Sequence, residues 1–316
     1  MAYYSGSANS YADVLSALVA ACVAEGWGWA DGILNKGPAY IRPFESVSVT
    51  ESQGPGLIIQ GGTGKSGSSL LNPSPEEPRM GKIWVNDPEV VWPVGYSIHI
   101  FDNPDEVFLV VRFNVDRFMW LSFGVSTVPG VQTGLWLSAT TRKGFKTQTS
   151  APGITISLTA GSDGDWQGGT NIGVTSGMPF WQHPRAISGY RNTDAVCCDL
   201  DGDIWAFGKD SARSMNAFRA ADPLIARGLS AWNQDAPFIP IQCYLARLAN
   251  KKSLIVDVRN ARYLRIDNYD PEQIITLGSD SWKIYPGYRK NSAARNGGTL
   301  IDHTGTFGWA IRYDGP

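Results

Sequence analysis

Apolar and polar residues alternate along the last segment of the chain, residues 307–313. The apolar side chains stand there at every second position, namely Phe307, Trp309, Ile311 and Tyr313. A two-residue period is typical of a β-strand with one buried face. The pattern therefore predicts that this end of the chain is a strand inside a sheet, tied down instead of fraying.

The clearest helical pattern covers residues 10–25. Ser10 can act as the N-cap, Asp13 follows three residues later as in a capping box, and Gly26 can end the helix. Its apolar positions fall on one stripe, formed by Val14, Leu15, Leu18, Val19 and Cys22. Short β-like runs follow at 39–42 and 57–60. The start of the chain therefore predicts a helix packed on a small sheet.

Two dense runs of aromatic and β-branched residues, at 96–100 and 106–113, predict a pair of strands. The sequence Asp-Asn-Pro-Asp at 102–105 supplies turn chemistry between them. We therefore expect a β-hairpin here, followed by a third strand at 117–125.

Strand patterns return in the second half of the chain. Asp201 and Gly202, inside a strand-like segment at 196–207, are a strong signal for a two-residue hairpin. A short helix is predicted at 221–232. Four successive strands are then predicted, at 239–248, 253–258, 262–266 and 273–276.

Two segments lack such periods. Residues 68–88 are rich in proline and predict an extended arm of the kind that reaches a neighbouring subunit. Residues 139–189 are rich in glycine, serine and threonine and predict a variable, outward-facing region. We divide the chain into an N-terminal helix and antiparallel sheet with the arm, a variable region with the short helix, and C-terminal strands that complete the core, at 1–138, 139–235 and 236–316.

The composition strengthens the prediction of strands. Among 316 residues, 35 are glycine and 19 are proline, and only 18% are charged, which favours short strands joined by turns over long solvated helices. The absence of a repeat of fixed period disfavours solenoids and propellers. The predicted fold class is α+β and β-rich, with the N-terminal helix packed on mostly antiparallel sheets.

The charge balance limits the choice of partners. The formal net charge is −2, and the basic residues are scattered, so direct binding to nucleic acid is not expected. No apolar run approaches the roughly 20 residues that span a bilayer. The first residues lack the basic region of a signal peptide, and we therefore expect synthesis and folding in a cytoplasm.

The sequence Gly-Thr-Gly-Lys-Ser at 62–66 is similar to the end of a phosphate-binding loop. The first glycine of that motif is replaced by Ile59, and Pro73 and Pro75 lie where the motif needs a helix. A hairpin loop is therefore favoured over nucleotide binding.

Four aspartates have part of the spacing of a calcium loop: Asp199, Asp201, Asp203 and Asp210. The glycine of such a loop is misplaced, at Gly202, and Asp210 stands where a bidentate glutamate is usual. A tight turn with solvated carboxylates is favoured over a calcium site.

The cysteines lack the spacing of a zinc site; they are Cys22, Cys197, Cys198 and Cys243. We predict buried thiols, with a metal cluster shared between several chains as the open alternative.

The histidines, His99, His183 and His303, do not lie near a nucleophile motif. The acidic pairs at 76–77 and 105–106 occur in turn or proline-rich contexts, whereas glycosidase acids need an enclosed cleft. We therefore predict no catalytic residue and no cofactor.

The 12 tryptophans have two interpretations, sugar stacking and the filling of sheets and subunit interfaces. Interfaces are favoured, and the first half of the chain is the expected place for them. The candidate interface residues there are Trp27, Trp29, Trp84, Trp92, Trp120 and Trp136. The candidates for stacking on a sugar are Trp166, Trp181 and Tyr190.

Three segments together resemble virion structural proteins encoded in the tail modules of tailed bacteriophages and prophages of proteobacteria. They are the sequence Ser-Ala-Asn-Ser-Tyr-Ala-Asp at 7–13 with its helix, the hairpin at 96–124, and the ending at 261–316. The resemblance covers both ends of the chain, and the middle, 139–233, departs from it most.

The resemblance implies a non-enzymatic part of a phage tail tip or baseplate, located in the virion and assembled in the host cytoplasm. Its partners would be further copies of itself, in a ring or symmetric set, and other tail proteins. A receptor- or carbohydrate-binding tail module that contacts the host surface is the first alternative. A cell-envelope hydrolase and a capsid or neck protein are further alternatives.

Overall fold

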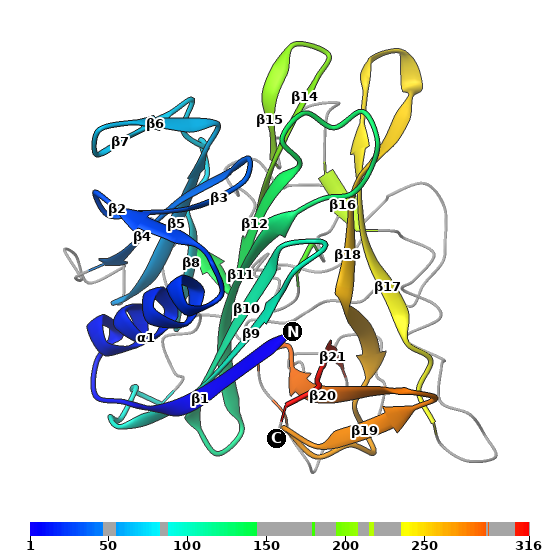
Figure 1. Ribbon diagram of the computed structural model, residues 1–316. Coiled ribbons are helices and arrows are strands. Elements are labelled where there is room, and N and C mark those ends of the chain that lie inside the picture. Colours follow the sequence, from blue (N-terminus) through cyan, green and yellow to red (C-terminus); the bar gives the residue numbers. More distant parts are fainter. Residues whose placement is uncertain are drawn as a thin grey trace, which may run out of the picture.

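The computed structural model describes residues 1–46, 55–82, 88–143, 179–180, 194–207, 215–217, 235–288, 290 and 307–315. These residues form three stacked β-sheet layers, and one long helix packs beside the first layer against the same face of the middle layer (Figure 1). All strand pairs in the described part are antiparallel, which confirms the predicted β-rich α+β class.

The middle layer, called here the central sheet, is apolar on both faces. In β10, Val107, Leu109 and Val111 face the first outer layer, whereas Phe108 and Val110 face the second. A strand buried on both faces needs a continuous apolar run instead of alternation. The strand order is β1 (Ala2–Ala8), β9 (Val94–Phe101), β10 (Glu106–Asn114), β11 (Arg117–Val125), β12 (Leu135–Ala139), β14 (Asp194–Leu200) and β15 (Asp203–Phe207).

The first outer layer, called here the helix-side sheet, packs on one face of the central sheet together with α1 (Tyr11–Ala24). Ser10 caps the helix by accepting a hydrogen bond from the Asp13 N–H at 3.0 Å, and Gly26 follows with a φ of 83°, as predicted. The order of the sheet is β13 (Thr141–Arg142), β8 (Pro78–Gly81), β5 (Gly56–Gly62), β4 (Ala39–Ser46), β3 (Ile33–Lys36) and β2 (Gly28–Ala30).

The second outer layer, called here the C-terminal sheet, covers the other face of the central sheet, on the right in Figure 1. Its order is β16 (Met215–Ala217), β17 (Ile239–Ala246), β18 (Lys252–Arg265), β21 (Phe307–Arg312), β20 (Asp280–Pro286) and β19 (Ile274–Leu277). The strand at the end of the chain, β21, pairs with β18 and β20. The prediction that this end lies inside a sheet is therefore confirmed.

Several predicted elements are confirmed, and others were missed. The hairpin of β9 and β10, the third strand β11, and the tight turn between β14 and β15 all form. The strands predicted at 253–258 and 262–266 are one strand, β18, whose register with β17 shifts between the two halves. Strands β1 and β20 were not predicted from the sequence. The helix predicted at 221–232 lies outside the described residues.

The prediction of a proline-rich arm at 68–88 is wrong for the part of it that the structure describes, 68–82 and 88. Strand β7 (Ser69–Leu71) forms a hairpin with β6 (Gly64–Ser66), and β8 is an inner strand of the helix-side sheet. Arg79 and Met80 are buried. Proline is tolerated here because Pro78 is the first residue of its strand.

The predicted boundary near residue 138 does not separate two sheets. Strands β14 and β15, which come from the predicted variable region, extend the central sheet beside β12. Most of that region, including 144–178 and 181–193, lies outside the described residues.

Candidate functional site

Three of the candidate interface tryptophans are buried inside the protomer. Trp27 is 2% exposed, and Trp120 and Trp136 are fully buried. The Trp120 indole N–H donates to the Gly287 carbonyl at 3.0 Å, and its ring lies 5.0 Å from that of Trp309. These three rings therefore fill the core and do not offer a surface to a partner, which corrects the prediction for them.

Of the remaining candidates, the structure describes two, Trp92 and Trp29. Trp92 is half-buried and packs edge-on against Tyr11, with ring centroids 5.1 Å apart. Trp29 is 41% exposed on β2. Trp84, Trp166, Trp181 and Tyr190 lie outside the described residues.

Strand β2, which carries Trp29, is the last strand of the helix-side sheet on its side. All three of its residues are exposed. Beyond it, a turn leads to β3, with Asp31 in an ion pair with Lys65 at 3.2 Å. An edge strand presents unpaired backbone N–H and C=O groups, and an exposed indole ring beside them adds apolar contact area.

Strand β19 is the corresponding edge of the C-terminal sheet. Ile274 is 49% exposed and Leu277 is 56% exposed. The strand contains no charged residue and no proline, so it lacks two of the usual features that block pairing with another chain. A strand was predicted at 273–276, but its position at the edge of a sheet was not.

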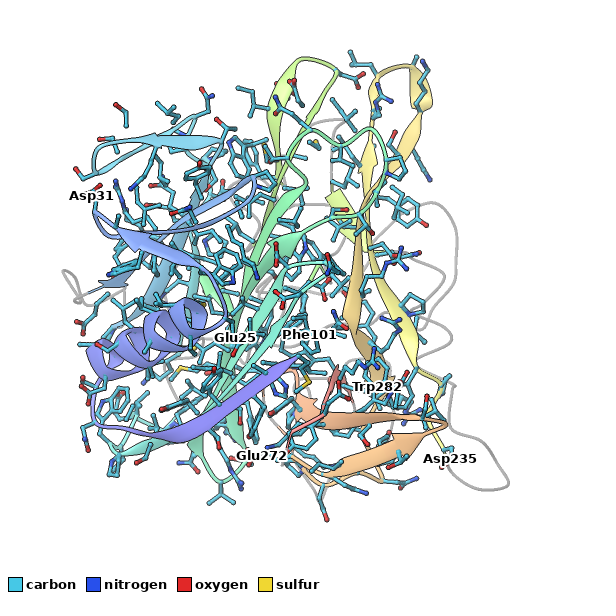
Figure 2. The ribbon with its side chains drawn as sticks, viewed as in Figure 1. Glu25, Asp31, Phe101, Asp235, Glu272 and Trp282 are labelled. Atoms are coloured by element: carbon cyan, nitrogen blue, oxygen red, sulfur yellow. The ribbon has the colours of Figure 1, made fainter. Side chains whose placement is uncertain are left out.

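The two edges lie on opposite sides of the molecule. Asp31 follows β2, and Trp282 of β20 pairs with Ile275 of β19; these two labelled residues are far apart in Figure 2. Two different surfaces on opposite sides suit a head-to-tail contact, in which each copy uses one edge toward each neighbour. We take β2 and β19 as the candidate functional site.

The segment 62–66, considered as a phosphate-binding loop, contains β6, the first strand of a hairpin with β7. A hairpin therefore forms here, but residues 64–66 are strand instead of loop, and the connecting turn lies at 67–68.

One of the aspartates considered for calcium, Asp201, occupies a tight turn with Gly202. Asp201 and Gly202 have φ angles of 55° and 83°, the left-handed conformation of a type I′ turn. The Asp201 carboxylate accepts two hydrogen bonds from Arg247, at 2.6 and 3.1 Å. Asp210 lies outside the described residues. Within the described residues, no group of three histidine, cysteine or acidic side chains is placed to hold a metal ion.

All four cysteines are free and buried, as predicted. His99 is buried in the central sheet, and its Nε2 lies 2.9 Å from the Tyr285 hydroxyl. Burial lowers the pKa of His99 to about 3, with the nearby Lys283 charge acting in the same direction. His99 is therefore neutral at physiological pH. His183 and His303 lie outside the described residues.

A buried carboxylate, Glu106, joins the central sheet to the C-terminal sheet. It accepts hydrogen bonds from the backbone N–H groups of Arg259 and Asn260 at 2.8 and 2.9 Å, and from the Asn260 side-chain amide at 2.9 Å. These donors lie where β18 shifts its register with β17. Burial raises the pKa of Glu106 to about 7, although the three hydrogen bonds lower it.

We expect this glutamate to make stability depend on pH. Between its ordinary pKa and about 7, the folded protein holds the Glu106 proton more tightly than the unfolded chain does. The free energy of unfolding should therefore fall as the pH rises from about 5 to about 7.5, by roughly 3 kcal/mol from this group, and then level off. Urea denaturation at several pH values across this range measures the free energy of unfolding. The Glu106→Gln variant should lose this part of the slope, and equal slopes in both proteins would contradict the assignment.

No helix in the described part of the chain is both long and apolar enough to cross a bilayer. No protein-family model matches the sequence, and neither does any curated protein.

Proposed function

We propose that the protein is a non-enzymatic structural subunit of a bacteriophage tail, at the tail tip or baseplate, which works by symmetric assembly. The observation that carries this proposal is the pair of uncharged, exposed edge strands, β2 and β19, on the two outer layers. The resemblance of both ends of the chain to tail-module proteins supports the location.

The physics of the edges supports assembly. A strand added to β19 would satisfy the backbone groups of its open side and cover Ile274 and Leu277. The three-layer core gives each copy a rigid frame, since the central sheet is buried on both faces. Rigid subunits with two distant contact surfaces close into rings when the rotation between copies allows it. The proposed partners are copies of this chain and other tail proteins, and the proposed location is the virion.

The edge strand can be tested by adding charge to it. Ile274→Lys combined with Leu277→Lys should convert an assembled ring into monomers, because two ammonium groups would have to be buried against the neighbouring copy. Light scattering on the purified protein measures the change. Leu248→Lys is the matched control, since Leu248 is 55% exposed on the distant turn between β17 and β18, and it should leave the mass unchanged.

The location needs a separate observation. An antibody to the purified protein should label the distal end of the tail on whole virions in negative-stain images, and the purified protein should form rings or other symmetric oligomers. A stable monomer together with unlabelled virions would overturn the proposal.

A further inference from the structure

The first strand and the last strands of the described chain meet around one phenol, that of Tyr3 on β1. The Lys283 ammonium, from β20, donates a hydrogen bond to the Tyr3 oxygen at 2.7 Å. The Ser97 hydroxyl, from β9, lies 3.0 Å from the same oxygen, and Ser5 is a further hydrogen-bond partner. Three polar groups from three strands therefore converge on one oxygen atom.

The Lys283 ammonium lies against the ring of this phenol. Its Nζ lies 4.7 Å from the centre of the Tyr3 ring and 5.5 Å from that of Tyr313, so aromatic rings surround it. No ion pair joins Lys283 to a carboxylate in the part of the chain that the structure describes. An ammonium group without a carboxylate partner leaves its charge available to stabilise a phenolate.

Buried groups behind the phenol hold Ser97 in place. Ser97 is also a hydrogen-bond partner of Tyr285, and the Tyr285 hydroxyl lies 2.9 Å from His99 Nε2. Because His99 stays neutral, it adds no second positive charge beside Lys283. Tyr285 is fully buried, and burial raises its pKa well above the ordinary value. The Tyr285 phenol therefore stays protonated and acts as a hydrogen-bonding partner.

The Tyr3 side chain is half-buried, and Ser5, which lies on the same side of β1 and next to the phenol, is exposed. Burial raises the pKa of Tyr3, but the hydrogen bonds from Lys283 and Ser97 and the charge of Lys283 outweigh it, so the pKa is lowered. The adjacent Tyr4 provides a natural contrast. Its hydroxyl donates to the Glu25 carboxylate at 2.6 Å, and this hydrogen bond raises its pKa.

We propose that the Tyr3 phenolic oxygen is a nucleophilic modification site that accepts activated acyl and sulfonyl electrophiles, with Lys283 and Ser97 as its positioning residues. In the reaction the phenolate oxygen attacks the electrophilic atom and forms a new bond to it. The leaving group departs with the electron pair of the bond that breaks, and the phenol proton passes to solvent water. The site involves neither β2 nor β19, so it stands independently of the proposed assembly.

The test uses the full-length protein and an aryl sulfonyl fluoride, whose fluoride is displaced by a phenolate. Labelling is followed residue by residue with peptide mass spectrometry between pH 6.5 and 9.5. At pH 7.5 we expect Tyr3 to react severalfold faster than Tyr4, because the pKa of Tyr3 is lowered and that of Tyr4 is raised, so that Tyr3 has the larger phenolate fraction. The rate at Tyr3 should also level off at a lower pH than the rate at Tyr4.

Variants separate reactivity from folding. Lys283→Met should slow labelling at Tyr3 by about tenfold and leave Tyr4 unchanged, and Lys283→Arg should keep most of the rate because it keeps the charge. Tyr3→Phe should abolish the label, whereas Tyr4→Phe should not affect it. The proposal is overturned if Tyr3 and Tyr4 react equally fast in the unmodified protein, a comparison that needs no variant to fold.

Discussion

Removal of residues 307–316 is expected to leave a chain that does not fold cooperatively. These residues include β21, which pairs with β18 on one side and with β20 on the other. Without β21, two ladders are lost and β19 and β20 are separated from the rest of the C-terminal sheet. Trp309, which is fully buried against Trp120 and Phe108, is lost as well.

The cost of this deletion can be compared with the total stability of a domain. Loss of one buried tryptophan costs about 3–5 kcal/mol, whereas a typical domain is stable by about 5–15 kcal/mol in total. The loss of a whole internal strand should therefore cost more than the entire free energy of unfolding of the protein. Circular dichroism during heating measures the result, with deletion of 315–316, beyond β21, as the control. A truncated protein with a sharp native-like melt would contradict the internal position of β21.

Trp120→Ala is expected to reduce the free energy of unfolding by about 3–5 kcal/mol. The Trp120 ring is fully buried between the central and C-terminal sheets. Its removal leaves a cavity beside Trp309 and deprives the Gly287 carbonyl of its donor. Urea denaturation, with the midpoint and slope compared between variant and parent, measures the loss.

Trp29→Ala is the matched control for that substitution. Trp29 is 41% exposed at the edge of the helix-side sheet, so the same chemical change should cost only about 0.5 kcal/mol in the monomer. If both substitutions cost the same, the separation of the tryptophans into core and surface residues is wrong. The pair therefore tests the correction made to the interface prediction.

Local patterns were sufficient for many individual elements. The capping residues Ser10 and Asp13 define the start of the helix, and Asp201 with Gly202 defines a hairpin. Alternation at 307–313 predicted a buried strand, which is β21. These signals depend on residues close in sequence, so they are readable without knowledge of the fold.

The elements that the sequence analysis missed or misplaced depend on contacts between distant segments. Strand β1 pairs with β9, 86 to 98 residues away in the chain, and the proline-rich segment is held in a sheet by β5 and β13. The break predicted inside β18 is the place where its register with β17 shifts and its N–H groups bind Glu106. None of these partners is encoded near the residues that need them.

The sequence by itself determined the β-rich class, the helix, the main hairpins and the buried character of the cysteines, because period, capping and turn chemistry are local properties. Only the tertiary structure decided which tryptophans are core and which are surface, which strands are edges, and that Tyr3, Ser97 and Lys283 meet. The physical reason is that burial and charge proximity depend on how layers stack. A strand has the same local pattern in the middle of a sheet as at its edge.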